Sequence, residues 1–461
     1  MAQLLILYHF AILLKSYVKK KFWTEPFYLD KLKDTAVFIK NYRELAKTTE
    51  RKIVLELIEA ALESIQPEEV FKQNVQRHGN ILSISGQEFD LDNFERVFIL
   101  GFGKGSAGNS KLLEKLITDR LTEGFVIDTE GEKFEKIEFT KGTHPLPSET
   151  NYKFTQNVLE KLSNLNEKDL ILVIICGGGS AMFVHPHSIS LSQKIAVGKA
   201  LLKSGANITE MNIVRKHLSD VKGGGLAQIL YPATVATLIY SDVPGNDLST
   251  IASGPTTLDR TTIEDALHVI KKYNLEEELN LSKDAFVENP QDKKYFEKVH
   301  NVIVLSNQTA LSAMQKKAKD LGWHAKIFSD RFESEAKTAG KKLISAAHHK
   351  SILLVGGETT VHVAKKAGKG GRNQELVLAA LEYVGREITI ASVASDGWDN
   401  TEHAGAIGDS RTLERARESG IDPNESLKTN NSLDFFKQTS DAIITGRLPS
   451  NVSDLMIVLR K

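Results

Sequence analysis

A glycine-rich turn in the sequence carries residue types suited to holding a phosphate group. It follows the apolar run from Ile171 to Cys176 and consists of Gly177, Gly178, Gly179 and Ser180. Glycines let consecutive backbone N–H groups converge on an anion, and a serine can cap the next helix or bond a phosphate oxygen. The same pattern is also typical of a strand-to-helix turn without a ligand, so both interpretations stay open for this stretch.

A second turn places a lysine at the end of a strand. Arg96 to Leu100 leads into the turn Gly101-Phe102-Gly103-Lys104-Gly105-Ser106-Ala107-Gly108. An ammonium there can offset charge on a phosphoryl group, although a solvated turn lysine fits the pattern equally well. The turn is not a Walker A loop, because no Gly-Lys pair in the chain is followed by Ser or Thr. It also has Ser106 where a dinucleotide fingerprint needs its third glycine.

Two further stretches combine charged and small residues. Asn207 to Gly225 places cations around Asp220, namely Arg215, Lys216, His217 and Lys222. A solvated helix face is the default for such a run, but cations beside a glycine turn also suit an anionic ligand. After the strand expected at Ala233 to Tyr240 come the residues Ser241-Asp242-Val243-Pro244-Gly245-Asn246-Asp247 and then Ala252-Ser253-Gly254-Pro255-Thr256. Carboxylates at a strand end can hold Mg²⁺ or accept a proton, and they equally suit a cap and a turn.

The second half of the chain carries a glycine loop that opens a helix with an arginine at its start. The stretch reads Gly368-Lys369-Gly370-Gly371-Arg372-Asn373-Gln374-Glu375, and an acidic turn, Ser395-Asp396-Gly397, follows a later strand. A guanidinium at a helix start can bind a carboxylate or a phosphate through two parallel hydrogen bonds.

The elements that must position these turns are strands alternating with helices. Further strands are expected at Val302–Leu305, Ala325–Ser329, Ile352–Val355, Ile388–Val393 and Leu455–Leu459. This alternation predicts an α/β protein of two domains, each a mostly parallel sheet with helices on both faces. Charged and polar residues between Asn274 and His300 mark the boundary, so we expect an N-terminal extension over 1–33 and domains over 34–290 and 301–461.

Composition limits the partners and the compartment. The chain has 461 residues with 59 basic and 59 acidic side chains, which predicts no nucleic-acid partner. The single cysteine, Cys176, cannot form an intrachain disulfide, so we expect a cytoplasmic protein. Leu4 to Leu14 is apolar but shorter than the roughly 20 residues that span a bilayer. We expect no membrane partner and interpret this segment first as an irregular extension, then as a peripheral helix, and last as an anchor.

Six of these motifs, in this order, resemble the glycerate 2-kinases with a C-terminal MOFRL domain. They are Gly101–Lys104, Cys176–Ser180, Ser241–Gly245, Ser253–Thr256, Gly370–Glu375 and Ser395–Gly397. The resemblance covers roughly Asp34 to Lys461. It implies ATP- and Mg²⁺-dependent phosphorylation of D-glycerate to 2-phosphoglycerate, in a cleft between a large Rossmann-like domain and the smaller MOFRL-type domain.

The resemblance also implies that Lys104 and Arg372 are catalytic. We expect Asp242 to be catalytic as well, with Asp242, Asp247 and Asp396 as metal ligands on the strength of their places at strand ends. Nucleotide contacts are expected at Gly177, Gly178, Gly179, Ser180, Lys216 and Gly254, and substrate contacts at Gly103, Arg215, Asp220 and Asn373. The partners are then D-glycerate and ATP, and a homodimer is one option. The alternatives are an NAD(P)H-dependent hydroxypyruvate reductase and a non-catalytic protein that binds nucleotides or sugar acids.

Overall fold

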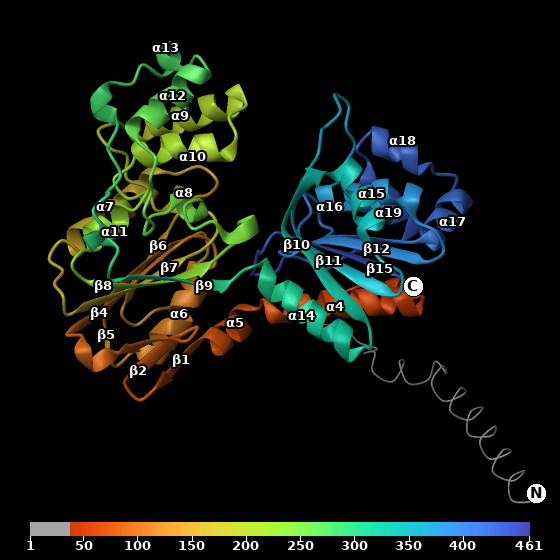
Figure 1. Cartoon of the computed structure of the whole chain (residues 1–461), viewed down its shortest axis with the longest axis horizontal. Coiled ribbons are helices and arrows are strands. Elements are labelled where there is room, and N and C mark those ends of the chain that lie inside the picture. The colour runs from red at the N-terminus through yellow and green to blue at the C-terminus, as the bar shows by residue number, and fades with distance from the viewer. Residues whose placement is uncertain (1–36) are drawn as a thin grey trace, which may run out of the picture.

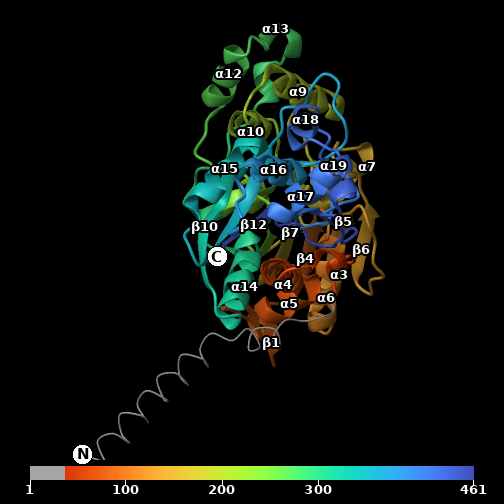
Figure 2. The ribbon, with the colours of Figure 1, turned by 90° about the vertical axis from the view of Figure 1, so that its right-hand side faces the viewer.

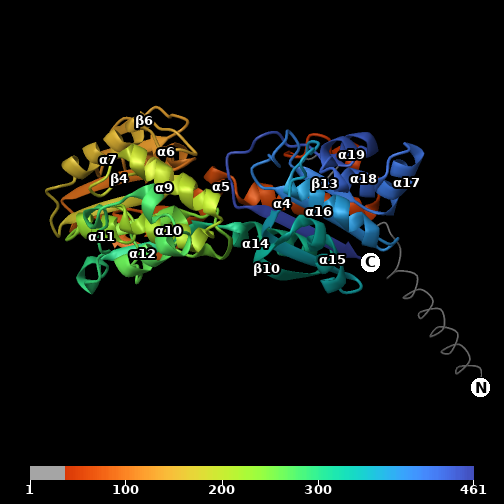
Figure 3. The same cartoon turned by 90° about the horizontal axis from the view of Figure 1, so that it is seen from above.

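The structure is a computed structural model that describes residues 37–461, so the extension expected over 1–33 lies outside the described residues. Two α/β domains lie side by side along the long axis of the molecule (Figures 1 and 3). None of the helices in the described part of the chain is long and apolar enough to cross a membrane.

The first domain is built on a six-stranded sheet whose neighbouring strands all run parallel. Its strands, in spatial order, are β6 (Ile137–Lys141), β5 (Leu121–Asp128), β4 (Arg96–Phe102), β7 (Asp169–Ile175), β8 (Thr234–Tyr240) and β9 (Val299–Leu305). By position in the chain this is the order 3-2-1-4-5-6 of the doubly wound nucleotide-binding fold. The order reverses between β4 and β7, and ligands of such sheets bind in the crevice at that point.

Helices cover both faces of this sheet. One face packs against α5 (Pro67–Asn74) and α6 (Ser106–Ile117), and the other against α7 (Glu149–Lys161), α8 (Gly179–Met182) and α11 (Gly225–Leu230). A separate apolar cluster holds together a cap of α9 (Leu191–Ser204), α10 (Ile208–His217), α12 (Ile263–Lys272) and α13 (Glu276–Leu279). A small antiparallel sheet that the sequence analysis missed comprises β1 (Val75–His78), β2 (Ile81–Ile84) and β3 (Gln87–Asp90).

The second domain also has a six-stranded sheet, but this sheet is mixed. Its spatial order is β10 (His324–Glu335), β11 (Ser351–Thr360), β15 (Asp454–Arg460), β12 (Ile388–Ala394), β13 (Gly405–Gly408) and β14 (Ala442–Ile443). Only β10 and β11 are parallel neighbours, and every other pair is antiparallel. The predicted α/β class and two domains are confirmed. The prediction of a mostly parallel second sheet is wrong, because the C-terminal strand β15 inserts between β11 and β12 in the opposite direction.

Helices from both halves of the chain cover the second sheet. One face carries α15 (Ala336–Ala346), α16 (Arg372–Ala380), α17 (Ser410–Glu418), α18 (Pro423–Lys428) and α19 (Ser432–Thr439). The other face packs against α14 (Asn307–Asp320) and α4 (Thr49–Ser64), with the short α3 (Tyr42–Leu45) beside α4 (Figure 2).

Two elements pack against or pair with the sheet of the other domain from the one expected from the predicted domain boundaries. Helix α4 falls within 34–290, yet it packs against α14 and the second sheet. Strand β9 extends into 301–461, yet it pairs with β8 in the first sheet. The side chain of Arg51 on α4 is 1% exposed and lies 2.6 Å from carboxylate oxygens of both Asp409 and Asp441, which fixes α4 to the second domain. Periodicity predicts such elements but not the sheet against which each packs.

Candidate functional site

A cavity of about 560 Å³ lies between the two domains at the carboxyl ends of β4, β7 and β8. From the first domain it is lined by Lys104, Gly177 and Asp242, among others. From the second domain Asp396 and Arg447 reach it. The cavity therefore sits where the strand order of the first sheet reverses, and it brings together four of the predicted turns.

The turn after β7 is shaped for a close approach of its backbone. Gly178 has a φ of +80°, and a Cβ added to Gly177 would lie 2.3 Å from Oδ2 of Asp242. A Cβ on Gly178 would lie 2.7 Å from Cδ2 of His144. Within residues 37–461, the backbone N–H groups of Gly177, Gly178 and Ser180 donate to no protein acceptor. The turn thus presents three unused donors, of which Gly177 lines the cleft.

At each of the other two glycine turns, a buried carboxylate already accepts two N–H groups at the start of the helix that follows. At the start of α6, the N–H groups of Gly105 and Ala107 donate to Oδ2 of Asp128 over 2.9 and 3.0 Å. At the start of α16, those of Asn373 and Gln374 donate to the two carboxylate oxygens of Asp399 over 3.0 and 2.9 Å. The turn after β7 is therefore the one of these three glycine turns whose following helix has no carboxylate cap.

Lys104 projects from the turn after β4 with an exposed side chain. Its backbone N–H donates to the carbonyl oxygen of Gly177 over 2.8 Å, which fixes the two turns side by side. Within the described range its ammonium group has no hydrogen-bond or ion-pair partner. Burial lowers the pKa of His144 nearby, and the charge of Lys104 lowers it further. An unpaired cation thus stands at the mouth of the cleft.

Asp242 lies at the end of β8 beside this cation. Burial raises the pKa of Asp242, and the negative charge of Glu358 from the second domain raises it further, whereas Lys104 acts in the opposite direction. A carboxylate with a raised pKa in a cleft is suited to accept a proton. Asp242 therefore remains our candidate for the general base.

Arg372 begins α16 and is held by two carboxylates. Its guanidinium lies 2.6 Å from Asp454 and 3.0 Å from Glu358 and is about one-third exposed. Burial raises the pKa of Asp454 to about 7, although Arg372 acts to lower it. Four of the hydrogen bonds that this guanidinium can donate are already made. Arg372 is thus less available to an incoming phosphate than its place in the sequence indicated.

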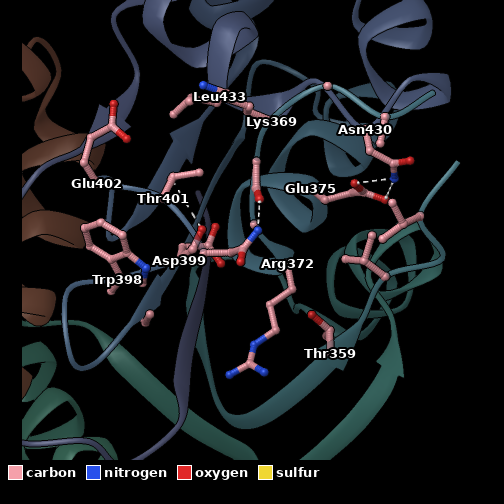
Figure 4. Close-up of a pocket in the computed structure, with 18 of the residues that line it drawn as sticks. Thr359, Lys369, Arg372, Glu375, Trp398, Asp399, Thr401, Glu402, Asn430 and Leu433 are labelled. Carbon is pink, nitrogen blue, oxygen red and sulfur yellow. Dashed lines mark hydrogen bonds between the residues drawn. The ribbon is translucent and has the colours of Figure 1, made fainter. Parts of the chain in front are cut away.

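A second cavity, of about 1050 Å³, opens within the second domain (Figure 4). Figure 4 shows Arg372 and Thr359 on one side of it and Trp398 and Glu402 on the other. Its wall includes Glu375, whose carboxylate accepts hydrogen bonds from the amide of Asn430 over 2.9 and 3.0 Å.

Several predicted contact residues have structural partners of their own. Asn373 is 1% exposed and bonds Asp399, Asp454 and Ser392. Lys216 is buried and lies 3.3 Å from Asp259. The carbonyl oxygen of Gly254 accepts the N–H of Gly224 over 2.7 Å. These three residues line neither cavity. Contacts within the protein hold all three residues in place.

Among the other predicted residues, Arg215 is the one left with unused donors. Asp220 is bonded by the rings of His185 and His187, each over 2.6 Å. Arg215 is half-buried, and burial lowers its pKa. No carboxylate pairs with it within residues 37–461, and its charge acts on Lys194, whose pKa burial lowers to about 7.

The predicted metal ligands are only partly brought together. Asp242 and Asp396 line the same cavity, whereas Asp247 accepts hydrogen bonds from Ser249 and Thr250 in its own turn. Residues 37–461 contain no group of three or more His, Cys, Asp or Glu side chains arranged to hold a metal. One or two carboxylates together with substrate phosphates are the usual Mg²⁺ site, so Asp242 and Asp396 fit this ion.

Two residues at the site escaped the sequence analysis: Asp128 and Asp399. Asp128 ends the second strand of the first sheet, at the spacing from the glycine turn at which dinucleotide-binding folds carry an acid. That spacing is a signal that could have drawn attention to Asp128.

The fold and the cleft define a two-domain α/β protein that presents cations and free backbone donors at the carboxyl edge of a parallel sheet. Residues 53–288 match the family described as domain of unknown function DUF4147, and residues 351–454 match the MOFRL family. The chain belongs to the glycerate 2-kinase family with a C-terminal MOFRL domain.

Individual relatives agree with this assignment. The chain is 34% identical to a D-glycerate 2-kinase of Thermotoga maritima, over 89% of this chain and 98% of that protein. It is 36% identical to a protein of Agrobacterium vitis provisionally named hydroxypyruvate reductase, over 79% of this chain and 87% of that protein. A crystal structure of glycerate kinase from Thermotoga maritima superposes with a TM-score of 0.78 at 32% identity, covering 89% of this chain and 99% of that one.

Proposed function

We propose that this protein is a glycerate 2-kinase that uses ATP to convert D-glycerate into 2-phosphoglycerate and ADP. The observation that carries the proposal is the unpaired Lys104 beside the free N–H groups of the turn after β7 and the carboxylate of Asp242. Phosphoryl transfer depends on positioning and on charge stabilisation, and this cleft supplies groups for both.

The chemistry requires few groups. The 2-hydroxyl oxygen of glycerate forms a bond to the γ-phosphorus of ATP, and the bond from that phosphorus to the β–γ bridging oxygen breaks. Asp242 accepts the hydroxyl proton, and ADP leaves with the bond electrons. Lys104 stabilises the negative charge on the transferred group, while the N–H groups of Gly177, Gly178 and Ser180 hold phosphate oxygens.

Mg²⁺ and the substrate carboxylate have candidate sites on this chain. Asp396 would hold Mg²⁺ together with the phosphates, and the ion would neutralise charge on the phosphate chain when bound. Arg215 is our candidate for the glycerate carboxylate, because its half-buried guanidinium has no carboxylate partner in the described part of the chain, although Arg215 itself lines neither cavity. We also place the enzyme in the cytoplasm, since Cys176 is buried and unpaired.

The reductase alternative meets a specific obstacle. In dinucleotide-binding folds the pyrophosphate binds the N–H groups at the start of the first helix. In this chain the corresponding helix is α6, and the carboxylate of Asp128 already accepts two of those N–H groups. A dinucleotide bound in that way would have to displace the buried carboxylate of Asp128 from these N–H groups.

The test is an ATP-consumption assay with D-glycerate and Mg²⁺, with 2- and 3-phosphoglycerate separated and an NADH assay with hydroxypyruvate run in parallel. We expect 2-phosphoglycerate and no NADH oxidation. NADH oxidation with hydroxypyruvate would replace the kinase with the reductase. Binding of ATP and D-glycerate without turnover would indicate the non-catalytic alternative.

A further inference from the structure

A loop of the second domain closes over the lysine turn of the first. The loop runs from Arg447 to Asn451, and the whole of it lines the cleft. The N–H of Leu448 donates to the carbonyl oxygen of Asp396 over 2.8 Å, which anchors the loop to the acidic turn after β12. A Cβ added to Gly105 would lie 4.0 Å from the carbonyl oxygen of Pro449, so the loop directly faces the Lys104 turn.

Arg447 is the cation that this loop brings to the cleft. Its guanidinium carbon lies 4.0 Å from the centroid of the Trp398 ring, and the Trp398 side chain is 38% exposed. No carboxylate lies within ion-pair distance of Arg447 among residues 37–461, unlike Arg372, which is held by two. An arginine stacked on an aromatic face keeps its in-plane N–H donors free for other partners.

We propose that Arg447 and Lys104 hold the polyphosphate chain of the phosphoryl donor from opposite domains, and that Trp398 positions Arg447. Identification of the ligand as a nucleoside di- or triphosphate rests on the proposed function. A polyphosphate carries several negative charges along its length and can use both cations, whereas a single carboxylate is satisfied by one. Each domain then contributes one cation that no carboxylate neutralises.

The first experiment compares Arg447→Gln with the wild-type protein by calorimetric titration of ADP, inorganic triphosphate and D-glycerate. Loss of one charge-assisted contact should weaken ADP and triphosphate binding by about 10- to 100-fold. D-glycerate binding and the free energy of unfolding should not change. Arg386→Gln is the matched control, because Arg386 is exposed, belongs to the same domain and lines neither cavity.

A second pair of variants tests the role of Trp398. Trp398→Leu removes the aromatic face and should weaken ADP binding by about 2- to 5-fold, the scale of an exposed cation–π contact. Trp398→Phe keeps an aromatic face, so most of the ADP affinity lost in Trp398→Leu should be retained. If Trp398 only filled space, the two variants would bind ADP equally well. ADP should also change the tryptophan fluorescence of the wild-type protein, and Trp398→Phe should abolish that change.

The outcomes separate this inference from the proposed function. If the wild-type protein phosphorylates D-glycerate but Arg447→Gln leaves the ADP affinity and the KM for ATP unchanged, the inference fails while the function stands. If no phosphorylation occurs but triphosphate binds the wild-type protein and not Arg447→Gln, the cation pair is supported and the function fails. Absence of any triphosphate binding to the wild-type protein would overturn the inference.

Discussion

Oγ of Ser453 donates a 2.7 Å hydrogen bond to the carbonyl oxygen of Asp242 and thereby joins the two domains at the cleft. Ser453 precedes β15, whose first residue is Asp454, the partner of Arg372. Asp242 follows β8 and lines the cleft with Lys104. One bond therefore links the strand end that carries the expected base to the strand that holds the expected catalytic arginine.

Ser453→Ala should lower kcat/KM about 5-fold. The variant loses one hydrogen bond between the domains, worth about 1 kcal/mol net, and the relative position of Asp242 and Arg372 becomes less fixed. Steady-state kinetics with D-glycerate and ATP measures this. Ser163→Ala is the control, since the exposed Ser163 hydroxyl bonds only the nearby carbonyl of Glu160. Equal kinetics of the two variants would contradict the role of Ser453.

Lys104→Ala should lower kcat by roughly 10²-fold or more, the scale seen when one charge-stabilising group is removed. The melting temperature should stay the same, because the Lys104 ammonium has no protein partner in the described part of the chain. Lys115→Ala, at an exposed position on α6, is the comparison. A Lys104 variant with near-normal turnover would remove this residue from the mechanism.

The pH profile of kcat/KM should show an acid limb that reports Asp242. Asp242 must be ionised to accept a proton, and its raised pKa places that limb above the usual range for an aspartate. Glu358→Gln removes a negative charge that contributes to the raised pKa of Asp242. The acid limb of this variant should therefore move to lower pH. A limb that stays in place, or moves to higher pH, would show that Asp242 is not the titrating group.

Arg372→Ala should lower stability as well as activity. The variant leaves the buried Asp454 without its cation, which costs about 1–3 kcal/mol for an unsatisfied buried group. An acid whose pKa is higher in the folded than in the unfolded state loses stability as pH rises through that folded pKa. Loss of Arg372 raises the pKa of Asp454 further, so the deficit should be larger at about pH 8 than at about pH 5.

Urea unfolding of Arg372→Ala at those two pH values measures the deficit. Arg372→Lys, which keeps the charge, is the companion variant, and it should recover part of the stability. A deficit that does not depend on pH would contradict the pairing with Asp454. Activity lost by Arg372→Ala alone is therefore weaker evidence for catalysis than activity lost by Lys104→Ala.

Arg51→Met should lower the free energy of unfolding by about 3–5 kcal/mol, because the buried Asp409 loses its cation and the buried Asp441 keeps only Arg415. The pKa of Asp409 is lowered, since hydrogen bonds and charge from Arg51 outweigh burial. The stability that the Arg51–Asp409 ion pair contributes is present at pH values above the ordinary pKa of an aspartate. It is lost as pH falls through the lowered pKa of Asp409. Urea unfolding measures it, and Arg43→Met on α3 is the exposed control. Equal stability of the two variants would contradict the network.

The sequence predicted the local part of the site. Strands β4, β7 and β8 are apolar runs that stop at glycine or acidic turns, and short-range residue preferences determine both features. Parallel strands place their carboxyl ends at one edge, which brought Lys104, Gly177 and Asp242 together as expected.

Contacts between segments far apart in the chain could not be predicted from short-range residue preferences. Lys216 stood in a run of cations, but its partner Asp259 lies in a loop further along the chain. Strand β15 is an apolar run like the parallel strands, and only its pairing partners determine its direction. The carboxylates of Asp128 and Asp399, which accept N–H groups at the starts of α6 and α16, likewise act across the fold.

The packing of α4 on the second sheet affects the order in which the protein can fold during synthesis. The first domain is complete once β9 has left the ribosome, because all six strands of its sheet have then been made. Helix α4 emerges before all of them, yet the sheet that covers its apolar side is finished only when β15, the last strand of the described residues, has been made. The nascent chain must therefore keep an apolar helix from aggregating throughout translation, and we expect the second domain to form last.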